Sequence, residues 1–170
     1  MIRKLGALAT VSVVLLVVAH CDKGLTPPED QGITGISGTI FFSNWPPPDS
    51  LFDLRLVAFK NFPPENILVE ILNGNAYVFP SIETDSAVVR KMLPFYADQV
   101  DYLFELPPGT YGYLAVAHQY GPNLLTDWQA VGQYDTDADS LPSPVVVREG
   151  EILRLIPITV DFHDLPIQPF

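Results

Sequence analysis

The block Phe104-Glu105-Leu106-Pro107-Pro108-Gly109-Thr110-Tyr111 decides the expected fold, because a rigid proline–glycine turn stands here between two apolar stretches. Pro108-Gly109 predicts a type II turn, which takes proline at its second position and glycine at its third. The stretch after the turn is apolar on both alternating faces, with Tyr113, Ala115 and Ala117 on one and Leu114 and Val116 on the other. A strand that is covered on both faces lies in the middle of a sheet.

Short β-rich runs recur on both sides of this block, and turn residues separate them. Among these turns, Asn73-Gly74 predicts a type I′ hairpin. Several short strands with regular turn signals predict an all-β domain, a single antiparallel β-sandwich. Thr84–Leu93 has an N-cap candidate at its start and a proline after its end, so it predicts either a two-turn helix or a loop. The predicted strands are Ile36–Phe42, Phe52–Lys60, Leu68–Leu72, Gln99–Leu106, Tyr111–His118, Trp128–Tyr134, Val145–Arg148 and Ile152–Phe162.

The proline–glycine block resembles a hairpin of carboxypeptidase-regulatory-like modules and of the related transthyretin-like and starch-binding-like sandwiches. Ile36–Ile40 is similar to the early strand of these modules, and Leu54–Phe59 to the strand that follows it. Val145–Val147, Gly150 and Ile156–Val160 are similar to their last strands. The resemblance implies an immunoglobulin/transthyretin-like sandwich. Because such modules are mostly non-catalytic, it implies a fold more than a function.

The N-terminus has the pattern of a secretory signal over residues 1–20, with Arg3 and Lys4 before the apolar run Leu5–Ala19. This run is shorter than the roughly 20 apolar residues that a membrane-spanning helix needs. Val18-Ala19-His20-Cys21 resembles the bacterial lipobox, which implies a diacylglycerol on Cys21 and an anchor in a membrane of the bacterial cell envelope. An ordinary signal-peptidase site after Ala19 is the alternative, because His20 stands where the lipobox has a small residue.

Two segments follow the signal. Residues 21–32 contain two prolines and several charges without periodicity, which predicts an extended tether. Residues 33–170 suit one β-sandwich domain with its own core.

The full chain has a net charge of −11. Loss of the two basic residues in the signal makes the mature charge −13. That balance argues against a nucleic-acid partner, whose phosphates favour clusters of Lys and Arg.

Two groups of residues are candidates for ligand binding. Asp135, Asp137 and Asp139 alternate on a predicted loop, and converging carboxylates are ligands for a hard cation such as calcium. We favour a solvated acidic loop for these residues, and the calcium site is the alternative. Trp45 and Trp128 could stack on sugar rings, because an indole offers a large apolar face beside a polar group. The alternative is that the two tryptophans pack at the ends of the core and have a structural role.

The sequence carries no nucleophile turn, phosphate-binding loop or paired-histidine motif, so we expect no enzyme and no cofactor. Calcium at the acidic loop is the one candidate. The leading interpretation is an envelope lipoprotein that acts as a non-catalytic structural or interaction module. A carbohydrate-binding accessory lipoprotein is the alternative. Expected partners are the membrane, reached through the lipid anchor, and other envelope proteins or polysaccharide.

Overall fold

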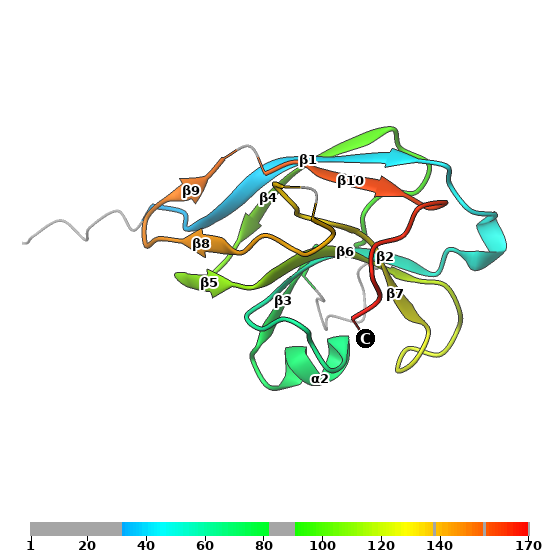
Figure 1. The fold of residues 1–170 in the computed structure, drawn as a ribbon, viewed down its shortest axis with the longest axis horizontal. Coiled ribbons are helices and arrows are strands. Elements are labelled where there is room, and N and C mark those ends of the chain that lie inside the picture. The colour runs from blue at the N-terminus through cyan, green and yellow to red at the C-terminus, as the bar shows by residue number, and fades with distance from the viewer. Residues whose placement is uncertain (1–31, 82–90, 138, 155, 170) are drawn as a thin grey trace, which may run out of the picture. The chain divides into compact units, whose positions relative to one another are not determined.

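A computed structural model describes residues 32–81, 91–137, 139–154 and 156–169 (Figure 1). The predicted signal, Cys21, the tether up to residue 31 and residues 84–90 of the predicted helix or loop lie outside the described residues.

The described part of the chain is built mainly of strands, which confirms the all-β prediction. Seven strands form one sheet in the order β3-β2-β6-β7-β10-β1-β4, with β9 paired to β1, while β5 and β8 form a separate two-stranded sheet. Neighbouring strands are antiparallel except that β9 and β10 each run parallel to β1. The elements are β1 (Gly35–Ser43), η1 (Pro48–Ser50), β2 (Asp53–Phe59), α2 (Ile67–Leu72), β3 (Ala76–Phe79), β4 (Gln99–Glu105), β5 (Gly109–Tyr111), β6 (Tyr113–Gln119), β7 (Trp128–Gln133), β8 (Val145–Val147), β9 (Ile152–Leu153) and β10 (Ile158–Asp161).

The large sheet curls around one main core. Leu54 and Leu56 of β2 share this core with Ile40 of β1 and Ile158 of β10, although β2 and β1 stand far apart in the strand order. The curl brings the two edge strands together, since the rings of Phe79 in β3 and Phe104 in β4 are 5.6 Å apart. Burial of these side chains against one another is the main stabilising contribution of the fold.

A second, smaller core covers the opposite face of β2, β6 and β7. Val57, Phe59 and Ala115 point to this outer face and pack beneath α2, whose Ile67 is buried against them. The strand β6 is therefore covered on both faces, as predicted, and it pairs with β2 on one side and β7 on the other.

The predicted strand Leu68–Leu72 is wrong, because this segment forms the helix α2. The side chain of Asn66 caps the helix by accepting hydrogen bonds from the backbone N–H groups of Leu68 and Val69. Gly74, with φ at 71°, ends it in a left-handed conformation. Asn73 has φ at −81°, which a type I′ turn does not allow, so the predicted hairpin is a helix C-cap instead.

Two other local predictions also fail. Gly109 has a positive φ of 158°, far from the roughly 80° that the third position of a type II turn takes, and it begins β5 instead. The connection from β4 to β5 is closed by the hydroxyl of Tyr111, which donates a 2.8 Å hydrogen bond to the carbonyl of Pro107. The single predicted strand Ile152–Phe162 is divided into β9 and β10, and Pro157, which has no N–H to donate, lies in the gap.

Candidate functional site

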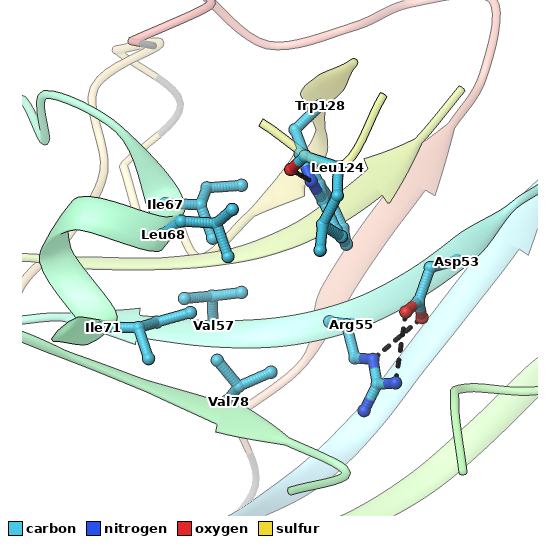
Figure 2. Close-up of a pocket in the computed structure, with 9 residues that line it drawn as sticks. All are labelled: Asp53, Arg55, Val57, Ile67, Leu68, Ile71, Val78, Leu124 and Trp128. Atoms are coloured by element: carbon cyan, nitrogen blue, oxygen red, sulfur yellow. Dashed lines mark hydrogen bonds and ion pairs between the residues drawn. The ribbon is translucent and has the colours of Figure 1, made fainter. Parts of the chain in front are cut away.

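A half-enclosed pocket of about 80 Å³ lies on the outer face of the sheet, between β2 and β3 on one side and α2 and the segment before β7 on the other. We call it the outer-face pocket. Most of its wall is apolar, and only two lining residues are charged. Figure 2 shows the aliphatic side chains of α2 facing Val57 and Val78, with the charged pair at the other side. The lining residues are Asp53, Arg55, Val57, Ile67, Leu68, Ile71, Val78, Leu124 and Trp128.

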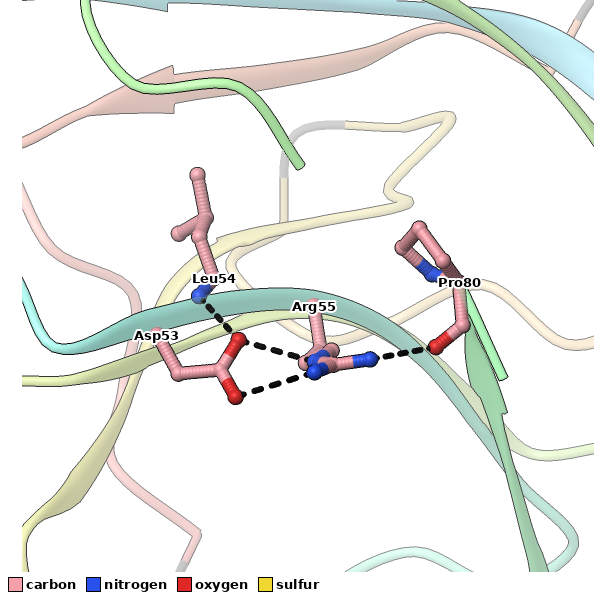
Figure 3. A network of polar contacts seen from close by, with 4 residues as sticks. All are labelled: Asp53, Leu54, Arg55 and Pro80. Carbon is pink, nitrogen blue, oxygen red and sulfur yellow. Dashed lines mark hydrogen bonds and ion pairs between the residues drawn. The ribbon is translucent and has the colours of Figure 1, made fainter. Parts of the chain in front are cut away.

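Asp53 and Arg55 form the polar side of the outer-face pocket. They stand two residues apart on β2, so both side chains leave the same face of the sheet. Arg55 donates from Nε to Asp53 Oδ1 at 2.8 Å and from Nη2 to Asp53 Oδ2 at 3.1 Å. Its Nη1 donates to the carbonyl of Pro80 at 2.6 Å, and the N–H of Leu54 donates to Asp53 Oδ1 at 2.8 Å (Figure 3).

This ion pair is buried, since each side chain is only 3% exposed. Removing two charges from water costs several kcal/mol per ion, and the mutual attraction offsets that cost only when the geometry is good. The two-pronged contact between the guanidinium and the carboxylate supplies such geometry.

A third polar side chain lies beside the pair. Gln119 of β6 stands in register with Asp53 on one neighbouring strand and with Trp128 on the other. Residues directly opposite each other in an antiparallel pair share a face, so the Gln119 side chain also leaves the outer face. Its Nε2 donates to the carbonyl of Gly121 at 2.8 Å, whereas its buried Oε1 has no hydrogen-bond partner among the described residues.

The structure places the two predicted tryptophans in different cores. Trp128 lines the outer-face pocket, and its Nε1 donates to the carbonyl of Leu124 at 2.8 Å. Trp45 packs at the end of the main core, with its ring centroid 4.8 Å from that of Phe162 and 5.0 Å from that of Phe42. The two indoles therefore do not form one stacking platform.

The three predicted carboxylates of the acidic loop do come together. One carboxylate oxygen from each of Asp135, Asp137 and Asp139 lies within 4.8 Å of the others. Repulsion from the neighbouring charge of Asp139 is the main cause that raises the pKa of Asp137. The loop borders a polar groove of about 390 Å³ that is also lined by Gln133, Thr159 and Asp164. Calcium binding at this loop stays a prediction.

His118 is a buried histidine with a structural role in the main core. It is 1% exposed, and its Nε2 lies 2.8 Å from the carbonyl of Ser50. Its Nδ1 lies 3.2 Å from the side-chain amide nitrogen of Gln129. Burial is the main cause that lowers the pKa of His118, and the contact with the Ser50 carbonyl opposes part of that effect.

Sequence reasoning did not select Asp53, Arg55 or Gln119. A signal was present, because two opposite charges at alternate positions interrupt one face of a strand that is otherwise apolar. Charges at such positions are buried as a pair when the strand is central, and the sequence had predicted a strand there.

No helix in the described ranges is both long enough and apolar enough to cross a membrane. No protein-family model, curated protein or solved structure matches this chain.

Proposed function

We propose that this protein is an exported, lipid-anchored protein of the bacterial cell envelope whose β domain is a non-catalytic interaction module. The outer-face pocket is the observation that carries the interaction part of this proposal. Its wall is mostly apolar, and its two charged residues form an ion pair with each other. A mostly apolar pocket with a few fixed polar groups is typical of ligand-binding sites. General acid–base catalysis needs a group that is placed to exchange a proton with the substrate, and the paired charges of Asp53 and Arg55 do not meet that need.

The anchoring part rests on the N-terminal sequence. Arg3, Lys4 and the apolar run before Cys21 have the pattern of a signal, and Cys21 is the only cysteine of the chain. An exported protein with one cysteine has no intramolecular disulfide to form with it. Acylation would give this cysteine a use, and the segment 22–32 would then hold the domain away from the lipid headgroups.

Metabolic labelling with palmitate in a bacterial host tests the anchor. The wild-type chain is expected to take up the label and to partition into detergent, while Cys21→Ala is expected to do neither. A mature protein that begins with a free amine at His20 would contradict lipidation and would establish ordinary cleavage.

Carbohydrate binding is supported less well. Sugar recognition by stacking needs an accessible aromatic face, whereas Trp45 is covered by neighbouring rings and Trp128 forms one wall of a narrow pocket. Calorimetric titration with soluble polysaccharides tests this alternative. Binding that is lost in both Trp45→Ala and Trp128→Ala would favour it over the interaction module.

The proposed architecture is a β-sandwich of the carboxypeptidase-regulatory-like kind, in which the two halves of the curled sheet are the two layers. The central position of β6 supports this proposal, and so does the contact of the Tyr111 hydroxyl with the carbonyl of Pro107. A similar tyrosine contact to upstream backbone occurs in immunoglobulin-type sandwiches. An experimental structure tests it, because a fully closed barrel would contradict the two-layer description.

A further inference from the structure

The size of the outer-face pocket limits what it can hold. Its volume of about 80 Å³ exceeds the space of a single water and is smaller than the roughly 150 Å³ cavity that accommodates benzene. Val57, Ile71 and Val78 line the pocket and offer only apolar contacts (Figure 2). These dimensions suit a short aliphatic group of about four to six heavy atoms.

Arg55 gives the polar side of the pocket unused hydrogen-bond donors. A guanidinium has five N–H groups. Three of these donate to Asp53 and to the Pro80 carbonyl, which leaves one on Nη1 and one on Nη2 without an acceptor among the described residues. Because Asp53 already balances the positive charge, the unused donors favour a neutral acceptor, such as a carbonyl oxygen, over a second carboxylate.

We propose that the outer-face pocket binds a short aliphatic group that carries a neutral amide carbonyl at its end. The carbonyl oxygen of the amide accepts from the Arg55 guanidinium. This proposal rests on the proposed interaction module and names the chemistry of its ligand. The amide can belong to a free small molecule or to an aliphatic residue of a peptide.

Titration of the detergent-solubilised full chain with isovaleramide tests the proposal by two-dimensional NMR. The chain has two tryptophans, so its two indole N–H signals can be assigned with Trp45→Phe. The Trp128 signal is expected to shift saturably, with a dissociation constant on the order of 1 mM for so small a ligand. The Trp45 signal is an internal control, and it should stay in place because Trp45 lies in the main core.

A ligand of the same shape provides the control for the amide. Isopentylamine keeps the aliphatic body but has a cationic end that cannot accept a hydrogen bond, so we expect it to bind at least about tenfold more weakly. Equal binding of the two ligands would overturn the proposal, and so would an unmoved Trp128 signal at about 0.1 M isovaleramide. Neither result depends on the state of Cys21, so palmitate labelling still tests the lipid anchor separately.

Matched variants test the location. Val78→Phe fills the pocket and is expected to abolish the shift, whereas Val69→Phe places the same ring on the exposed side of α2 and should leave it unchanged. Binding that survives Val78→Phe would overturn the assignment to this pocket. N-acetyl-leucinamide distinguishes the sources, because tighter binding than isovaleramide indicates a peptide and weaker binding indicates a free small molecule.

Discussion

Asp53 and Arg55 show how a single strand can carry a charged pair inside an apolar environment. Each side chain alone would be too costly to bury, and the pair is accommodated because the guanidinium donates to both carboxylate oxygens, at 2.8 and 3.1 Å. A buried pair of this kind adds little net stability compared with apolar residues of similar size. Its effect is to fix where each side chain lies on the outer face.

Removal of one partner should therefore be much worse than removal of both. Asp53→Leu leaves the buried Arg55 guanidinium with the Pro80 carbonyl as its only acceptor among the described residues, and we expect a loss of about 3–5 kcal/mol in the free energy of unfolding. The double variant Asp53→Leu/Arg55→Leu should recover most of that loss. Urea denaturation measures both. A double variant that is as unstable as the single one would show that the pair contributes more than mutual neutralisation.

His118 gives the stability of the domain a dependence on pH. Its pKa in the folded protein is lowered from the ordinary 6.5, mainly by burial, so the unfolded chain binds the proton first as the pH falls. Stability from this group is fully present above about pH 6.5 and is lost as the pH falls toward the lowered pKa of the folded state.

The measurement is a comparison of urea midpoints at pH 8 and pH 5 for the wild type and His118→Gln. The variant should lose less stability than the wild type between these two values, since glutamine does not titrate. An equal loss in the two proteins would remove His118 as a source of the pH dependence. His163→Gln, at an exposed position, is the matched control.

Calcium binding at the acidic loop also depends on individual residues. If Asp135, Asp137 and Asp139 hold calcium, a concentration ten times the dissociation constant should stabilise the fold by about 1.4 kcal/mol. For a domain of this size that is a rise of roughly 3–5 °C in Tm. Asp137→Asn should remove the rise and leave the calcium-free protein equally or slightly more stable. A rise that persists in Asp137→Asn, or none in the wild type, would leave a solvated loop.

Among the elements, the helix α2 is the clearest case of a segment whose sequence pattern predicted the wrong secondary structure. Its apolar residues Leu68, Val69 and Leu72 suggested a strand, but the cap at Asn66 and the left-handed Gly74 enclose a helix. The N–H of Gly74 donates to the carbonyl of Ile71, and the N–H of Asn75 to that of Glu70, which is the Schellman pattern. Six residues make a marginal helix in isolation, so its packing over the second core stabilises it.

Gly74 is therefore expected to be sensitive to substitution. Gly74→Ala should destabilise the domain by more than about 1 kcal/mol, because φ at 71° is unfavourable for a residue with a side chain. A Cβ at this position would meet open space, so the cost is conformational and not steric. Gly74→Asn should cost less than Gly74→Ala, because asparagine tolerates this conformation. Thermal denaturation that ranks alanine above asparagine in stability would contradict the C-cap assignment.

In the whole molecule, the sheet curls so that strands far apart in the strand order contribute side chains to the same main core. Leu56 and Ile158 come from opposite halves of the sheet and are both fully buried in the main core. Truncation of either to alanine should cost about 2–5 kcal/mol. Both variants should lower the urea midpoint without a change in the m-value, because single domains of this size generally unfold in one cooperative transition. Two separate transitions in either variant would show that the halves unfold independently.

The positions of most strands could be predicted from local sequence patterns. The short β-rich runs that became β1, β2, β4 and β7 are a local pattern, and the turn residues that separate these strands act within a few positions. The sequence also indicated that β6 is central, since both of its faces are apolar. Among the candidate site residues, the convergence of Asp135, Asp137 and Asp139 could be foreseen because they are neighbours on one loop.

The curl of the sheet and the outer-face pocket could not be predicted in this way, because both depend on contacts between distant segments. The parallel pairing of β1 with β10 joins segments more than a hundred residues apart, and nothing local to either segment specifies that partner. In the same way, the pocket joins side chains from β2, α2, β3 and the start of β7. Gln119 lies opposite Trp128 because of the register between β6 and β7. Local preferences select the conformation of a segment, whereas burial of one segment against another selects its neighbours, and that choice depends on the whole chain.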